Sequence, residues 1–164
     1  MSVDYIVSSL PTLTFGQPAP IDWARFAEIA GEIVLPAAWT DLETQLRNVL
    51  VDARAALRGD AAAARPDKFK RPAAGCSIFW RNRVLACFQE RNVAKRDELL
   101  DRVWWDAAGE LTPPESPLGA GALATYAIRL KIALKRTKIS KDAGNAAFDR
   151  LTAETKIDFG KERT

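Results

Sequence analysis

The sequence predicts an all-α protein, a bundle of five or six helices with a short extended N-terminal segment. Apolar residues recur at helical spacing along most of its 164 residues, and the breaks between these stretches coincide with proline and glycine. The hydrophobic fraction of 48% and the charged fraction of 27% are typical of a globular chain, which excludes a disordered or fibrous one. We expect a single helical domain over residues 1–164, with two lobes, 1–110 and 118–164, as the alternative arrangement.

The first part of the chain is expected to hold an extended opening and two helices. The opening YIVSSLPTLTF mixes β-branched and aromatic residues, which favours an extended segment. Asp22 is a suitable N-cap for a helix that ends before Pro36. Thr40 and Glu43 have the spacing of a capping box, and they predict the start of a second helix that Gly59 closes.

The remaining helices are separated by proline-rich stretches. Residues 60–75 are alanine-rich and then basic, and their two prolines predict a loop. From Ser77 the apolar positions fit one long helix or two shorter ones with a break near Asn92. The segment GELTPPESPLGAG cannot be helical throughout, so it precedes a final pair of helices, the second of them capped by Ser140.

Several patterns bear on catalysis, and each has a structural interpretation. The chain has no histidine, which removes the common nucleophile–base pairs and histidine metal sites. Cys76 and Cys87 would lie about 16 Å apart on a continuous helix, too far for a disulfide, and are interpreted as buried thiols in a reducing compartment. Asp97 and Asp101 have basic neighbours, which favours a salt-bridged face. We therefore expect no enzyme, no catalytic residue, no cofactor and no bound metal.

One further motif, GAGALA at 119–124, has the spacing of a dinucleotide-binding loop. No strand is expected before it, so its glycines are interpreted as the turn into a helix.

The apolar stretches are also too short for a membrane span. They fall below the roughly 20 residues that a bilayer requires, and no basic region precedes the apolar residues of the N-terminus. We expect a cytoplasmic location.

Charge is distributed unevenly although the formal net charge is only +3. Residues 1–53 hold two arginines against seven acidic residues, a net of −5, whereas residues 54–102 hold twelve basic against six acidic residues, a net of +6. A basic middle predicts an acidic partner, and a protein, a nucleic acid, a lipid head group and a merely solvated helix face all remain open. Nucleic-acid binding is the main alternative, because basic residues alternate there with Phe79, Trp80 and Phe88.

Two segments resemble a known family. The opening YIVSSLPTLTFGQPAPIDWARF and the C-terminal LATYAIRLKIALKRTKISKDAGNAAFDRL, with Tyr126, Leu130, Lys131 and Gly144 in matching places, are similar to uncharacterised bacterial proteins encoded with V-type (A-type) ATPase subunits. The resemblance covers about a third of the chain. It implies an all-helical fold distantly similar to the ATPase C (d) subunit, which connects the central stalk to the membrane rotor.

The resemblance also implies a role and a location. A non-catalytic subunit linking stalk and rotor in proton or sodium transport, or an accessory or assembly factor, would bind stalk or rotor subunits and lie at the inner membrane through them. No small-molecule substrate is expected. Two groups of basic residues are the candidate partner-binding sites: Arg81, Arg83, Arg91, Lys95 and Arg96 in the basic middle, and Arg129, Lys131 and Lys135 near the C-terminus.

Overall fold

The described part of the chain is all-helical, as predicted. The computed structural model describes residues 1–59 and 66–159, and these contain six α-helices and no strand. The elements are α1 (Val3–Ser9), α2 (Trp23–Ala30), α3 (Ala37–Arg58), the 3-10 helix η2 (Pro66–Phe69), α4 (Ile78–Cys87), α5 (Val93–Ala108), the 3-10 helix η3 (Gly109–Leu111) and α6 (Ala120–Phe159).

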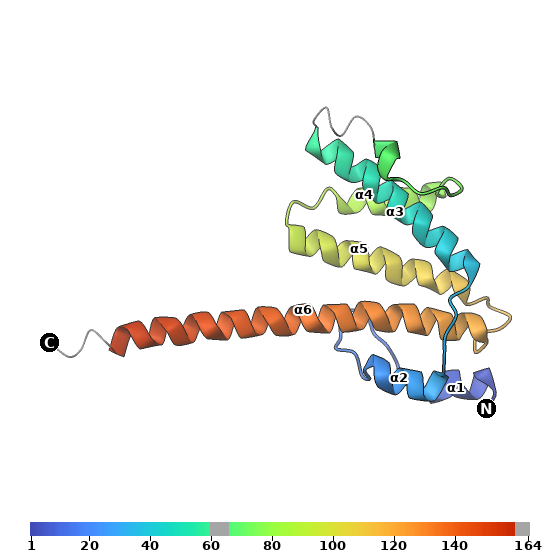
Figure 1. Cartoon of the computed structure of the whole chain (residues 1–164), viewed down its shortest axis with the longest axis horizontal. Helices are drawn as coiled ribbons and strands as arrows, with labels where there is room; N and C mark the ends of the chain where they lie inside the picture. The colour runs from blue at the N-terminus through green and yellow to red at the C-terminus, as the bar shows by residue number, and fades with distance from the viewer. Residues whose placement is uncertain (60–65, 160–164) are drawn as a thin grey trace.

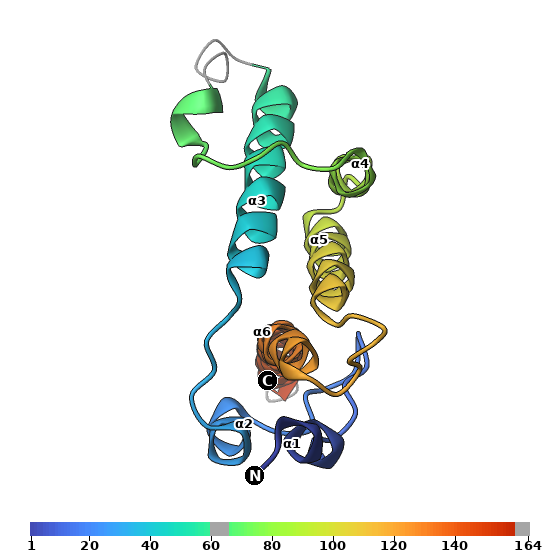
Figure 2. The ribbon, with the colours of Figure 1, turned by 90° about the vertical axis from the view of Figure 1, so that its right-hand side faces the viewer.

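Helix α6 forms the middle layer of the molecule. Helices α1 and α2 lie against one side of its first half, and α5, with α4 and α3 beyond it, lies on the other side (Figure 1). Figure 2 shows the same arrangement along α6, with α1 and α2 below it and α5 above it. The second half of α6 extends past all of these helices.

Each side of α6 has its own hydrophobic core. The core shared with α1 and α2 contains the buried residues Phe26, Leu123, Ala127 and Leu130. The core shared with α3, α4 and α5 contains Trp39, Leu46, Val49, Trp80, Val84, Cys87, Val103, Ala107, Ala108 and Ile128. Because α6 contributes to both cores, residues 120–137 pack together with helices from across residues 1–110.

Several predicted helix ends are confirmed. The carboxylate of Asp22 accepts the N–H of Arg25 at 2.7 Å and caps α2. Gly59 closes α3 with a left-handed φ of 63°. Of the two alternatives that the pattern after Ser77 left open, the structure has the break near Asn92, whose side chain accepts the N–H of Lys95 and caps α5. Consequently α4 and α5 are separate helices.

The expected extended opening is wrong. Residues Val3–Ser9 form α1, which the side chain of Ser2 caps by accepting the N–H of Tyr5. Ile6 and Val7 pack against the core shared with α2 and α6. Packing on α6 therefore outweighs the β-propensity of this segment.

The first two long helices also differ from expectation at their ends. Helix α2 stops at Ala30, well before Pro36, because Gly31 adopts a positive φ of 72°. Helix α3 begins at Ala37, so Thr40 lies inside its first turn and does not form the predicted capping box. Its backbone carbonyl instead accepts the hydroxyl of Thr44.

The predicted final pair of helices is one continuous helix. Ser140 lies inside α6 and does not cap a new helix. No proline or glycine occurs between Leu123 and Gly144, so nothing in the sequence interrupts the backbone hydrogen bonds.

The predicted loop at 60–75 falls partly outside the described residues. Within the described part, residues 66–69 form η2 and residues 70–75 are non-helical. Among the helices described, none is both long and apolar enough to cross a bilayer.

Candidate partner-binding site

The basic residues predicted in the middle of the chain have different surroundings. Arg81 and Arg91 are exposed, and neither pairs with a carboxylate among the side chains that the structure describes. Lys95 is exposed and pairs with Glu98 at 3.3 Å. Arg96 is used inside the fold: its Nε donates to the carbonyl of Glu90, and its guanidinium lies over an aromatic ring of α4's C-cap. Arg81, Arg91 and Lys95 can therefore bind a partner without losing contacts like those that hold Arg96 in the fold.

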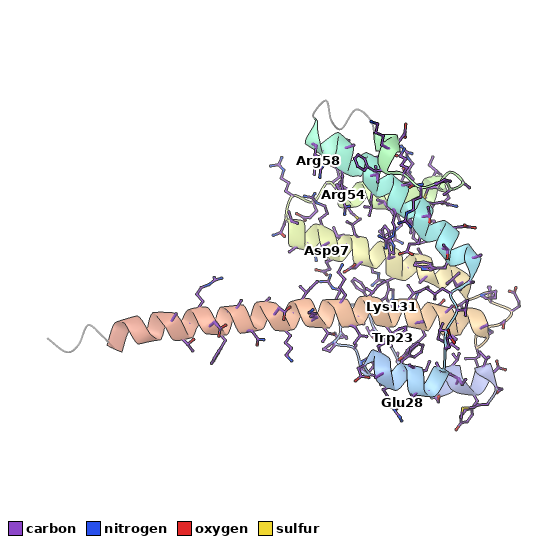
Figure 3. All side chains as sticks on the ribbon, viewed as in Figure 1. Trp23, Glu28, Arg54, Arg58, Asp97 and Lys131 are labelled. Carbon is purple, nitrogen blue, oxygen red and sulfur yellow. The ribbon has the colours of Figure 1, made fainter. Side chains whose placement is uncertain are left out.

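The three predicted residues on α6 do not share a face. Arg129 points toward α5, where its Nε donates to the backbone carbonyl of Trp105 at 3.0 Å. The ammonium of Lys131 lies 4.8 Å from the ring centroid of Trp23 on α2 (Figure 3). Residues two positions apart on a helix point in nearly opposite directions, which explains this separation.

Lys135 is bound to the two aspartates that the sequence placed on a salt-bridged face. Its Nζ lies 2.8 Å from Asp101 and 3.2 Å from Asp97. Burial alone would lower the pKa of Lys135, but the hydrogen bonds to Asp101 and Asp97 outweigh it and raise that pKa. Arg136 also pairs with Asp101 at 3.1 Å. The two aspartates are salt-bridged, as expected. Their partners are cations of α6 and not their basic neighbours on α5, so these ion pairs join α5 to α6.

Two other predicted residues, Arg83 and Arg129, lie near a carboxylate that the sequence did not single out, and Arg83 pairs with it. Asp106 on α5 accepts Nη2 of Arg83 on α4 at 2.7 Å. It also accepts Nε of Arg102, one turn earlier on α5, at 3.1 Å. Arg129 on α6 is close enough to feel the charges of Asp106 and Arg102. We call these four residues the Asp106 cluster; it carries three guanidinium groups and one carboxylate.

Aromatic rings hold the guanidinium groups of this cluster. The guanidinium of Arg83 lies 5.2 Å from the ring centroid of Trp80, and that of Arg129 lies 5.2 Å from the ring of Trp105. Arg102 lies 5.1 Å from the ring of Phe15, which itself meets Trp105 edge-on at 5.5 Å. Cation–π contacts of this kind restrict the rotation of a long side chain, so the cluster is ordered before any partner arrives.

The electrostatics of the cluster leave an excess of positive charge. Burial lowers the pKa of Arg129, the charge of Asp106 opposes that shift, and the charge of Arg102 adds to it. Arginine nevertheless stays protonated at neutral pH. The cluster therefore has a net charge of +2, from three cations and one anion.

The cluster also keeps unused hydrogen-bond donors. Each guanidinium has five N–H groups, and within the described residues only Nη2 of Arg83 and the Nε atoms of Arg102 and Arg129 donate. No buried side-chain nitrogen or oxygen of the described residues lacks a partner, and the side chains of Arg83 and Arg102 are 32% and 50% exposed, so these two keep N–H groups in contact with solvent. A carboxylate or phosphate from outside could accept two of them side by side.

Two other kinds of site, a reactive thiol and a metal site, find little support in the described residues. Burial raises the pKa of the thiols of Cys76 and Cys87, which makes both less reactive. Cys87 is buried and Cys76 half-buried, and both are free. No group of three or more Cys, Asp or Glu in the described part of the chain could hold a metal ion.

Sequence reasoning missed Arg102, Asp106 and Phe15. A local signal exists for the first two, which are spaced four apart as in helical ion pairs. No signal exists for Phe15, which approaches Trp105 from a loop 90 residues away in sequence.

Comparisons with known proteins did not identify a relative. No protein-family model matches the chain, and neither the curated proteins nor the solved structures contain a match.

Proposed function

We propose that this chain is a non-catalytic subunit or assembly factor of a bacterial V-type ATPase, which binds an acidic surface of a stalk or rotor subunit through the Asp106 cluster. The observation that supports this is that arginines of α4 and α5 pair with one carboxylate, with a third arginine on α6 close by, and that the side chains of Arg83 and Arg102 remain partly exposed. The nature of the ATPase partner rests on the resemblance of the opening and C-terminal segments, with which the all-helical fold is compatible.

A protein surface that carries carboxylates suits the cluster better than a negative charge without the planar shape of a carboxylate would. Arginine forks bind carboxylates in a planar, bidentate manner, and such charge-assisted hydrogen bonds are roughly twice as strong as neutral ones. The rings of Trp80, Trp105 and Phe15 already restrain the guanidinium groups. Ordered arginine and tryptophan side chains are frequent among the residues that dominate binding energy in interfaces.

The most direct test removes one arginine that the fold can spare. Arg102 is the choice because its side chain is half exposed, and because Arg83 still pairs with Asp106 in Arg102→Gln. Arg25→Gln is the matched control: Arg25 lies on α2, is 62% exposed against 50% for Arg102, and also pairs with a carboxylate on its own helix, Glu28.

The measurement is affinity capture of the tagged full chain from its native cells in mild detergent, with mass spectrometry of what is recovered. We expect stalk or rotor subunits with the unmodified chain and with Arg25→Gln, and about tenfold less with Arg102→Gln. Recovery of ATPase subunits that Arg102→Gln leaves unchanged would overturn the assigned surface. The double variant Arg81→Gln/Arg91→Gln then tests the two exposed, unpaired arginines instead.

The same capture examines the nucleic-acid alternative. Nucleic-acid binding predicts recovery that nuclease abolishes and that falls steeply with salt concentration. Recovery of nucleic acid without any ATPase subunit above background would replace the proposal by that alternative.

A further inference from the structure

A groove on the other side of α5 is separate from the Asp106 cluster. It lies between α3, α5 and α6, has a volume of about 390 Å³, and is lined on α5 by residues such as Leu100 and Trp104. Asp106 lies two positions beyond Trp104 and so points to the opposite side of the helix. Whatever binds in this groove therefore does not compete directly for the cluster.

The groove exists because α3 and α6 do not close on each other. Helix α3 packs mainly against α4, and α6 packs against α5, which leaves a gap between the outer two (Figure 2). Its floor is apolar and includes Trp39, Leu50, Leu100, Trp104, Ile128 and Ile132. A concave apolar surface of this volume is in the range of small-molecule sites.

The residues that line the groove have a net charge of +1, from four cations and three carboxylates. All three of its carboxylates are paired: Glu43 with Arg47, and Asp97 and Asp101 with Lys135. Arg54 is exposed and has no carboxylate partner within the described part of the chain.

Lys131 also lines the groove, but its ammonium lies over the ring of Trp23 on α2. Among the described residues, Arg54 is therefore the groove cation that neither a carboxylate nor an aromatic ring holds. Figure 3 shows Arg54 on α3 and Lys131 on α6, on opposite sides of α5 in this view.

We propose that this groove binds an amphipathic anion of the fatty-acid type, with its carboxylate on Arg54 and its alkyl chain along the apolar floor toward Trp39. From Trp39 to Arg54 the helix rises about 22 Å, long enough for an extended chain. The volume of about 390 Å³ suits a single alkyl chain, and the unpaired Arg54 favours an anionic head group.

The structure supplies both a reporter and a matched control. Trp39 and Trp104 line the groove, so their fluorescence reports an occupant directly. Arg58 lies one turn beyond Arg54 on the same helix and is likewise exposed and without a carboxylate partner among the described residues, but it does not line the groove (Figure 3).

The test titrates the full chain with octanoate, decanoate and dodecanoate, each below its micelle concentration, and follows tryptophan fluorescence and heat. We expect saturable one-to-one binding that tightens about fourfold for each CH₂ buried. Arg54→Glu should weaken the binding of dodecanoate at least tenfold, whereas Arg58→Glu and Arg102→Gln should leave it unchanged.

Three results would each overturn the proposal. They are the absence of saturable binding, equal weakening by Arg54→Glu and Arg58→Glu, and equally tight binding of dodecyltrimethylammonium, which has the opposite head-group charge. Because Arg102→Gln affects only the proposed partner surface, failure of one proposal is distinguishable from failure of the other.

Discussion

The two parts of α6 differ sharply in how much of their surface is buried. In residues 120–137 the buried side chains are Leu123, Ala124, Thr125, Ala127, Ile128, Leu130 and Ala133. In residues 138–151 every residue is exposed, including Ile139, Phe148 and Leu151. Helix α6 thus begins in the centre of the fold and continues into a segment against which no other described helix packs (Figure 1).

This difference separates two sources of helical structure. Isolated helices shorter than about 12–15 residues are marginal in water, and most helical stability in proteins comes from packing an apolar face. The inner part has apolar residues on two sides, because one core uses Ile128 and the other uses Leu130. The outer part extends a helix that the inner part has already nucleated. Substitutions in the two parts should therefore have very different effects on stability.

The largest effect is expected from truncating a fully buried side chain of the inner part. Leu130 has no exposed surface, and Leu130→Ala should lower the free energy of unfolding by roughly 2–5 kcal/mol. Phe148, which is 64% exposed in the outer part, should change it by less than about 0.5 kcal/mol when replaced by alanine. Urea denaturation followed by circular dichroism measures both.

A large loss of stability in Phe148→Ala would contradict this difference between the inner and outer parts of α6. It would mean that the outer part is packed in solution, and a dependence of the denaturation midpoint on protein concentration would then identify a second copy as the cover.

The two glycines of α6 should respond to alanine with opposite signs. A Cβ at Gly121 would lie inside van der Waals contact with the carbonyl oxygen of Leu111, whereas a Cβ at Gly144 meets nothing within 4 Å. Gly121→Ala should destabilise the fold by about 1–3 kcal/mol, because backbone has to move. Gly144→Ala should stabilise it by about 0.5–1 kcal/mol, because glycine is a poor helix former. Thermal denaturation of the two variants side by side measures both changes in stability. A rise in stability for Gly121→Ala would show that α6 and η3 are not in close contact.

The smallest effect concerns the hydroxyl that ties the inner part to the N-terminal segment. The hydroxyl of Tyr126 donates to the carbonyl of Pro11 at 2.9 Å, and its ring stacks on Phe26. Tyr126→Phe should cost about 0.5–1.5 kcal/mol at neutral pH. Burial raises the pKa of Tyr126 to about 12, above the value of about 10 in an unfolded chain.

The pH dependence follows from the direction of that shift. The neutral tyrosine is favoured by the fold, so its contribution is complete below about pH 10 and is lost as the pH rises toward 12. The stability of the unmodified chain should fall relative to Tyr126→Phe over that interval. Denaturation midpoints of both proteins at several pH values test this, and a constant difference would refute the role of burial at Tyr126.

Local sequence signals predicted those features that depend on neighbours in the chain. The cap at Asp22 and the closing Gly59 each involve a side chain or a φ angle within four residues of the helix end, whereas the pattern left open whether the chain breaks at Asn92. The same signals failed where long-range packing competes with them. Ile6 and Val7 have β-propensity but become helical because α1 packs on α6.

The candidate site was predictable only in part, for a similar reason. Arg83 and Arg129 were selected from the basic composition of their segments, in two separate groups. Their common neighbour Asp106 lies 23 residues from either of them, and no spacing rule connects positions on three different helices.

The sequence alone determined the helical class, several helix ends such as those at Asp22 and Gly59, and the uneven distribution of charge, because these follow from periodicity, capping residues and composition. Only the tertiary structure decided which cations face a carboxylate, an aromatic ring or solvent, and which part of α6 is covered. Those outcomes depend on how α4, α5 and α6 pack, since contacts between helices join residues that are distant in the chain. The groove beside Arg54 has the same origin, because it is the space left where α3 packs on α4 instead of α6.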